Sequence, residues 1–189
     1  MNEKNNDIKF MKKALDCATA ALNRGDFPVG CVITYDNHII SSGERTVSEG
    51  KFSNELDHAE IHAISNLTAK KDVMNWDINQ CTIYSSLEPC LMCFGAILNH
   101  KIPRIVYAFE DAMGGGTSLD RSHLPPLYAS FDIEIVSGIC RQESLLLFQT
   151  FFNNPNNRYL ADSFFASYVD QLTSDQNVEN ERNKINTTS

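Results

Sequence analysis

Two short motifs in the sequence contain the residue types that bind a catalytic metal ion. The first is His58-Ala59-Glu60 and the second is Pro89-Cys90-Leu91-Met92-Cys93. Zinc prefers imidazole nitrogen and thiolate sulfur, and a catalytic zinc has three protein ligands and an open position for water. His58, Cys90 and Cys93 supply one such set of ligands. We therefore predict one zinc ion per chain, with Glu60 close enough to transfer protons without being a ligand.

The spacing within each motif indicates how these side chains reach one ion. Cys90 and Cys93 are three residues apart, so they lie on nearly the same side of a helix that begins after Pro89. The partial positive charge at a helix N-terminus lowers the pKa of a thiol and favours the thiolate. His58 and Glu60 are two residues apart, about 200° around a helix, so they can share a site only at the helix N-terminus. The sequence thus predicts two helix N-termini that face one metal ion.

Three other interpretations of these residues remain open. Asp57 and Glu60 have the spacing of a capping box, which would give Glu60 a structural role. His58 and His62 are spaced as in a metalloprotease helix, but the glutamate of H-E-x-x-H directly follows the first histidine, and here it comes one residue later. The third is a structural zinc module, which leaves Glu60 unexplained and takes a fourth ligand from Cys31, Cys81 or His62.

The composition is that of a globular protein with a substantial core. The 189 residues are 42% hydrophobic and 21% charged, a usual balance for a single domain. The formal net charge of -8 argues against a large nucleic-acid contact surface, because phosphate contacts need clustered lysine and arginine. The N-terminus does not resemble a signal peptide, and no apolar run approaches the roughly 18 residues of a membrane span. We therefore expect a cytoplasmic protein with four reduced core cysteines: Cys17, Cys31, Cys81 and Cys140.

The apolar periodicity predicts alternating helices and strands around the two motifs. An amphipathic helix opens the chain and ends near Arg24-Gly25, and Asp36-Asn37 forms the turn of a hairpin. A polar loop from Glu44 to Asp57 then leads to His58. The alternation that follows favours an α/β sandwich whose later strands are parallel, with the metal ligands near the strand C-terminal ends. We expect strands at 30–35, 38–42, 81–86, 104–108 and 133–136, and helices at 58–70, 90–100 and 141–152.

The C-terminal third of the chain contains a glycine-rich loop and a helical extension. Gly114-Gly115-Gly116 lacks the lysine and the helix start of a P-loop, so we interpret it as a mobile connector near the pocket. Asn153 to Asn157 interrupts the helical pattern, and one more helix within 159–172 is expected to pack on the domain. We therefore predict a single domain over 1–172, with the extension starting near 158, and a disordered polar tail over 173–189.

Four motifs in the same order and spacing carry a resemblance to a known family. They are Phe27-Pro28-Val29-Gly30, His58-Ala59-Glu60, Ser86-Leu87-Glu88-Pro89-Cys90-Leu91-Met92-Cys93 and Gly95-Ala96-Ile97. From about Asp7 to Phe152 the chain resembles the cytidine deaminase-like superfamily, whose zinc enzymes share the H-x-E and P-C-x-x-C signature. It is most similar to the branch of bacterial tRNA adenosine deaminases, guanine deaminases and fungal-type cytosine deaminases.

The resemblance implies a fold, a cofactor, an assembly and roles for particular residues. The fold class is α/β, a three-layer α/β/α sandwich with a five-stranded mixed sheet. Each subunit holds one zinc ion, and the assembly is usually a homodimer with the site near the interface. Glu60 transfers protons during deamination, and the backbone N–H of Ala59 binds the substrate. Phe27 lines the pocket by resemblance, although an aromatic side chain in this loop could instead pack on the core.

Two departures from the family pattern bear on the substrate. Relatives usually have an asparagine after the second strand that contacts the base or the sugar, and this chain has Arg45 there. A guanidinium donates but cannot accept hydrogen bonds. Arg45 therefore either faces the pocket and selects negative charge or a carbonyl edge, or it is a solvated loop arginine paired with Glu44 or Glu49. The connection from Val47 to Asp57 is also longer and could reshape the pocket mouth.

The sequence predicts a zinc-dependent hydrolase that replaces an exocyclic amine by a carbonyl and releases ammonia. The expected substrate is a free base, a nucleoside or a related small heterocycle. The alternative is a tRNA-specific wobble adenosine deaminase. We do not favour tRNA as the substrate because the tRNA enzymes commonly have a basic segment after a Phe-Phe pair, where this chain has Asn153-Asn154-Pro155-Asn156-Asn157. Weak, nonspecific tRNA binding at physiological salt is therefore expected.

Overall fold

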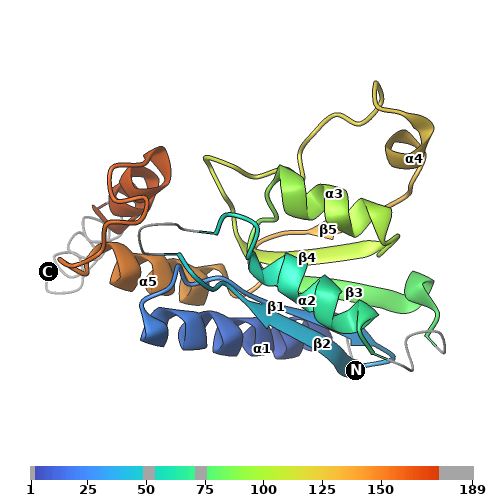
Figure 1. The fold of residues 1–189 in the computed structure, drawn as a ribbon, viewed down its shortest axis with the longest axis horizontal. Coiled ribbons are helices and arrows are strands. Elements are labelled where there is room, and N and C mark those ends of the chain that lie inside the picture. Colours follow the sequence, from blue (N-terminus) through green and yellow to red (C-terminus); the bar gives the residue numbers. More distant parts are fainter. Residues whose placement is uncertain (1–2, 49–53, 71–75, 175–189) are drawn as a thin grey trace, which may run out of the picture.

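A single mixed sheet organises the computed structural model, which describes residues 3–48, 54–70 and 76–174. Its strand order is β2-β1-β3-β4-β5. β1 pairs antiparallel with β2 and β3, whereas β3, β4 and β5 are parallel to one another, so the expected mixed sheet with parallel later strands is confirmed (Figure 1). The bounds are β1 (Gly30–Tyr35), β2 (His38–Glu44), β3 (Cys81–Leu87), β4 (Arg104–Phe109) and β5 (Glu134–Val136).

Helices cover both faces of the sheet, which confirms the three-layer α/β/α architecture (Figure 1). One outer layer contains α1 (Glu3–Arg24) and α5 (Arg141–Phe152), and the other contains α2 (Ala59–Thr68) and α3 (Leu91–Asn99). The connections carry two short elements that the sequence did not predict, a 3-10 helix at Ile78–Gln80 and α4 at Pro126–Ala129. No helix within the described ranges is both long and apolar enough to cross a membrane.

The hairpin between β1 and β2 has the turn that the sequence predicts. Asp36 and Asn37 both have positive φ, 46° and 60°. A two-residue turn of this kind matches the twist of the flanking strands and needs positive φ at both central positions. Aspartate and asparagine tolerate that conformation better than other side chains, so the prediction rests on local chemistry and is confirmed.

Close contact between α1 and the sheet depends on a glycine in β1. A Cβ atom on Gly30 would lie 2.2 Å from the carbonyl oxygen of Ala14 and 2.3 Å from the backbone nitrogen of Ala18. Both neighbours are main-chain atoms, so a side-chain rotation cannot relieve the clash. The absence of a side chain at Gly30 therefore sets how closely α1 approaches β1.

We expect Gly30→Ala to destabilise the protein. Overpacking against main-chain atoms should lower the free energy of unfolding by about 2–3 kcal/mol, which corresponds to a Tm lower by about 4–12 °C for a chain of this size. The matched control is Gly95→Ala in α3, where a Cβ atom would meet nothing within 4 Å, and where alanine favours the helix. Thermal unfolding of both variants tests the contact, and equal Tm values would contradict it.

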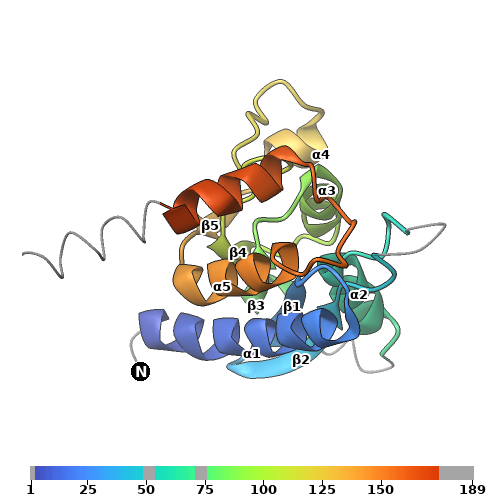
Figure 2. The ribbon, with the colours of Figure 1, turned by 90° about the vertical axis from the view of Figure 1, so that its left-hand side faces the viewer.

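The C-terminal extension forms a helix that lies against α5 (Figure 2). It spans 164–174 and starts later than predicted because the side chain of Ser163 accepts a hydrogen bond from the backbone N–H of Ala166 and caps it. Phe165 is buried, with its ring 5.1 Å from that of Phe148. Tyr168 donates a hydrogen bond of 2.6 Å to Glu110, just after β4. The extension thus packs on the domain. The predicted start of the disordered tail is wrong, because Thr173 and Ser174 belong to this helix and Thr173 accepts a hydrogen bond from Gln149. The rest of the predicted tail, 175–189, lies outside the described residues.

Candidate active site

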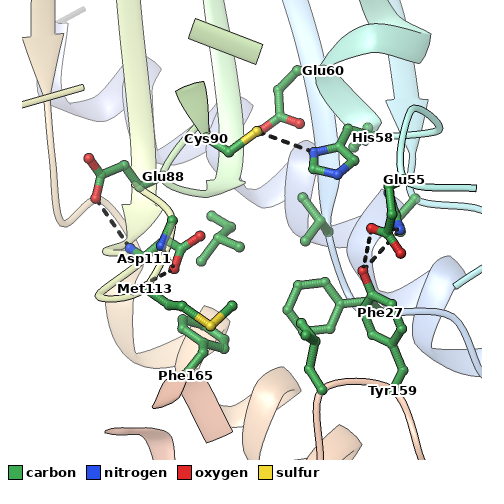
Figure 3. A pocket seen from close by; sticks show the side chains of 16 residues that line it. Phe27, Glu55, His58, Glu60, Glu88, Cys90, Asp111, Met113, Tyr159 and Phe165 are labelled. Atoms are coloured by element: carbon green, nitrogen blue, oxygen red, sulfur yellow. Dashed lines mark hydrogen bonds and ion pairs between the residues drawn. The ribbon is translucent and has the colours of Figure 1, made fainter. Parts of the chain in front are cut away.

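His58, Cys90 and Cys93 meet where α2 and α3 begin. His58 is the N-cap of α2 and Cys90 is the N-cap of α3, just beyond the C-terminal end of β3. His58 Nδ1 lies 3.6 Å from Cys90 Sγ and 3.4 Å from Cys93 Sγ. The side chains of His58 and Cys90 face each other in Figure 3. The two helix N-termini therefore approach one point, in the arrangement inferred from the spacing of the motifs.

The surroundings of these groups fit a divalent metal ion. The hydrogen bond with Cys93 lowers the pKa of Cys90 to about 4, against the effect of burial and with help from His58. The same hydrogen bond, together with burial and the charge of Glu60, raises the pKa of Cys93. Burial lowers the pKa of His58, but the hydrogen bond with Cys90 and the charge of Glu60 raise it overall. A metal cation deprotonates a thiol that coordinates it, so one imidazole and two sulfurs form a donor set suited to zinc.

Glu60 lies beside this cluster in the first turn of α2 and is 2% exposed. Its Oε1 accepts a hydrogen bond of 2.7 Å from Ser85 Oγ, and its Oε2 lies 3.4 Å from Cys93 Sγ. Burial raises the pKa of Glu60, although the hydrogen bond from Ser85 and the charge of His58 act in the opposite direction. A carboxyl group with a raised pKa is suited to both accept and donate protons near neutral pH.

The capping-box interpretation of Asp57 and Glu60 is wrong. The N-cap of α2 is His58, and no side chain caps that helix end. Asp57 instead pairs with His62, with 3.3 Å between Asp57 Oδ1 and His62 Nε2. The carboxylate of Glu60 is occupied with Ser85 and Cys93, so it is not used for capping. The capping-box spacing in the sequence does not show whether Glu60 caps the helix or faces the site, because both roles place a carboxylate at the same helix end.

A closed structural zinc site is not what the structure shows. Within the described residues, the group that could hold a metal contains His58, Cys90 and Cys93 alone. Cys31 and Cys81 are buried in the core and do not belong to this group. All six cysteines are free, although Cys17 and Cys140 are only half-buried, not core residues as expected.

A cavity of about 220 Å³ adjoins the cluster. Figure 3 shows His58, Glu60 and Cys90 on one side of it, and Phe27, Tyr159 and Phe165 on the opposite side. Apolar side chains make up much of the wall, with a few polar groups that converge on it, as is typical of a small-ligand site. The remaining lining residues are Val29, Arg45, Glu55, Ala59, Leu87, Glu88, Asp111, Met113, Gly114 and Leu160.

Phe27 and Ala59 both border this cavity. Phe27 is 7% exposed, and its ring lies 5.2 Å from that of Phe148 and 5.6 Å from that of Tyr159. It therefore packs in the aromatic core and lines the cavity at the same time, so the two interpretations do not exclude each other. Ala59 is the first residue of α2, and its backbone N–H has no acceptor within that helix. Both positions allow contact with a bound base.

The glycine-rich loop is held against the beginning of α3. The Glu88 carboxylate accepts hydrogen bonds from the backbone N–H of Asp111, at 3.2 Å, and from Thr117 Oγ1, at 2.5 Å. Gly115 forms a bridge with Cys90, and a Cβ atom on Gly115 would lie 2.4 Å from Glu88 Oε2. The glycine is required by this close approach. The loop thereby brings Gly114 to the cavity wall.

Arg45 is buried at the cavity and is not a solvated loop residue. It is 2% exposed, and its Nη2 donates hydrogen bonds of 2.9 Å to Glu55 Oε2 and 3.0 Å to the hydroxyl of Tyr159. Glu44, one of the two expected partners, pairs with Arg24. The other expected partner, Glu49, lies outside the described residues. The interpretation of Arg45 as a solvated loop arginine is therefore wrong.

The sequence analysis missed the cavity residues that come from distant segments. Tyr159, Leu160 and Phe165 belong to the C-terminal extension, and Tyr159 contacts Glu55 across 104 positions. Asp111 and Met113 come from the loop after β4. The aromatic content of the extension was visible in the sequence, but nothing local to it indicated a place beside the metal cluster.

Comparisons with known proteins place this architecture in a family. Residues 4–109 match the model described as the cytidine and deoxycytidylate deaminase zinc-binding region. The chain is 35% identical to tRNA-specific adenosine deaminase 2 of Danio rerio over 157 residues, which is 78% of this chain and 72% of that protein. It is 30% identical over 149 residues to the tRNA-specific adenosine deaminase of Streptococcus pyogenes serotype M18, with 79% and 91% covered.

Solved structures agree with this placement. A structure from work on A-to-I editing by tRNA:A34 deaminases at the wobble position has a TM-score of 0.61 and 28% identity, covering 74% of this chain and 98% of that one. A structure in complex with 8-azaguanine, at 23% identity and a TM-score of 0.61, shares the fold. The chain therefore belongs to the cytidine and deoxycytidylate deaminase family, as the motifs predict. It is a hydrolytic deaminase with zinc as its cofactor.

Proposed function

We propose that this deaminase converts adenosine to inosine in tRNA. The observation that carries the proposal is the identity of 30–35% to tRNA-specific adenosine deaminases over more than three quarters of the chain. The sequence analysis placed this substrate second, after a free base or nucleoside. The substitution of Arg45 for asparagine and the lack of a basic tail led to that order, but neither feature excludes RNA.

The size of the cavity supports a single base as the group that enters it. Its volume of about 220 Å³ is smaller than the roughly 300–1,000 Å³ of sites for drug-sized ligands. Enzymes that modify a base in a nucleic acid turn the target nucleotide out of its stack and into such a pocket. The adenine would then occupy the cavity, and the ribose and the phosphates would lie at its mouth.

We infer that His58, Cys90 and Cys93 hold the zinc ion. When bound there, zinc supplies a Lewis acid that makes water nucleophilic at neutral pH. Glu60 accepts one proton from the water that adds to C6 of adenine and delivers it to N1. It then transfers the remaining proton of the new C6 hydroxyl to the amine, which leaves as ammonia as the C6 carbonyl forms. Ser85 orients the Glu60 carboxylate through its 2.7 Å hydrogen bond.

We propose that the remaining wall residues orient the base. The N–H of Ala59 donates a hydrogen bond to it, and the aromatic ring of Phe27 packs against it. The net charge of -8 argues against a large cluster of phosphate contacts, so the contacts outside the pocket would come mainly from the ribose and the neighbouring bases. A homodimer and a cytoplasmic location remain predictions from the sequence and the family.

Direct assay of RNA and small molecules tests the proposed substrate. The zinc-loaded protein is incubated with tRNA carrying adenosine at the wobble position, and inosine is measured by nucleoside analysis and by sequencing. We expect inosine at that position, and ammonia release from adenine, adenosine, cytosine, cytidine or guanine at least about 100-fold slower, because remote contacts of a true substrate contribute to the rate. Faster release from a free base or nucleoside would overturn the proposal and restore the small-molecule substrate.

A further inference from the structure

We propose that Arg45 determines specificity, with its Nη1 donating a hydrogen bond to a ring-nitrogen acceptor of the adenine in the cavity. The inference rests on the proposed function and names the residue that recognises the adenine. Arg45 lines the cavity and is 2% exposed. Its Nη1 is buried and has no hydrogen-bond partner among the described parts of the chain. A buried donor without a partner is unfavourable, and a ligand in the adjoining cavity would supply the missing acceptor.

The other guanidinium nitrogens are held in place. Nη2 donates to Glu55 Oε2 at 2.9 Å and to the Tyr159 hydroxyl at 3.0 Å, and Nε donates to Ser48 Oγ at 3.3 Å. The guanidinium is planar and rigid, so fixing Nε and Nη2 also fixes the direction in which Nη1 points. Glu55, Ser48 and Tyr159 are therefore positioning residues for the donor.

Tyr159 connects this donor to the C-terminal extension. Its hydroxyl accepts from Arg45 Nη2 and donates a hydrogen bond of 2.9 Å to Glu55 Oε2. Burial raises the pKa of Tyr159 to about 12, so the hydroxyl keeps the proton that it donates. The ring also lies beside the guanidinium, with Arg45 Cζ 5.6 Å from the ring centroid. The extension thus takes part in base recognition through Arg45.

The chemistry of the guanidinium selects among bases. Arg45 can only donate hydrogen bonds, whereas the asparagine usual at this position in relatives both donates and accepts. Apart from the amine that is removed, the polar atoms of adenine are acceptors: N1, N3 and N7. Glu60 serves N1, which leaves N3 or N7 for Arg45. Guanine also has acceptors at N3 and N7, so this contact alone does not separate adenine from guanine, whereas pyrimidines have neither of these purine atoms.

Binding measurements in an inactive background test this contact. The protein carries Glu60→Gln and zinc, so the substrate binds without turnover. Its ligands are anticodon stem-loops with adenosine, 3-deazaadenosine or 7-deazaadenosine at the target position. We expect one of the two analogues to bind about 10- to 100-fold more weakly than adenosine, the range for a hydrogen bond from a charged donor. Adding Arg45→Met should weaken adenosine binding to the same extent and remove the difference between the analogues.

Two further variants separate recognition from structure. Tyr159→Phe keeps Arg45 but removes a positioning hydrogen bond, so it should weaken discrimination between the analogues and leave the zinc content unchanged. Arg141→Met is the matched control, because Arg141 pairs with Glu110 under the same extension but does not line the cavity. It should leave the discrimination intact. Tyr159→Phe also tests the proposal if Arg45→Met fails to fold.

The outcomes distinguish this inference from the proposed function. If the active enzyme forms inosine but neither deaza analogue binds more weakly than adenosine, Arg45 does not read the base and the inference is overturned. If the active enzyme acts on a free nucleoside and not on tRNA, the proposed function fails. The same comparison with adenosine and its deaza analogues as free nucleosides then decides the role of Arg45.

Discussion

Glu60→Gln should abolish deamination while the protein keeps its fold and its zinc. Glutamine has the shape of glutamate and can still accept the hydrogen bond from Ser85, but a neutral amide cannot take up and return protons. Loss of general acid-base catalysis alone costs about 10²–10⁴ in rate. Since Glu60 serves both the attacking water and the leaving ammonia, we expect a loss toward the upper end of that range.

The measurement combines three readouts on one preparation: the rate of inosine formation, the zinc content and the Tm. Asp57→Asn is the matched control, because Asp57 is a carboxylate at the same helix end that pairs with His62 and does not line the cavity. This variant should retain most of its activity. Substantial activity in Glu60→Gln with full zinc content would contradict the proton-transfer role.

Features encoded by a few neighbouring residues were predictable from the sequence. The helix at Arg141–Phe152 and the turn at Asp36-Asn37 were predicted within a residue, because apolar spacing and turn chemistry are local. The approach of two helix N-termini was also accessible, since His58 and Cys90 each precede a helical pattern. His58 follows β2 and Cys90 follows β3. These two strands run in the same direction on either side of the antiparallel β1, so both helix starts lie at the same edge of the sheet.

Features that depend on distant contacts were not predictable. The sequence singled out Arg45 but proposed Glu44 or Glu49 as its partners, because nearby charges are the only candidates that a sequence displays. Its side-chain partners in the structure are Ser48, Glu55 and Tyr159, and Tyr159 is 114 positions away. The cavity wall formed by the extension depends on the same kind of long-range packing.

The sequence ranked tRNA below a small molecule for a related reason. Net charge is a property of the whole chain, and the value of -8 describes mainly the solvated surface. A pocket that admits one base needs few basic residues, so an acidic protein can still act on RNA. The comparisons with whole relatives carry information that a sum of charges does not.

Replacing either cysteine of the cluster should remove most of the zinc and, with it, the activity. In Cys90→Ser or Cys93→Ser, a hydroxyl takes the place of a sulfur, and a serine hydroxyl does not ionise near neutral pH as a coordinating thiol does. Two remaining ligands from the set of His58, Cys90 and Cys93 cannot maintain a site that needs three.

Cys31→Ser and Cys81→Ser are the matched controls, because both residues are buried in the core outside the cluster. These controls can lower the Tm, so zinc is measured per folded protein by metal analysis after gel filtration. Controls that keep a full equivalent of zinc, beside cluster variants that lose it, identify Cys90 and Cys93 as ligands. An equal loss in all four variants would show that zinc content follows the stability of the fold, and the assignment of these two ligands would then fail.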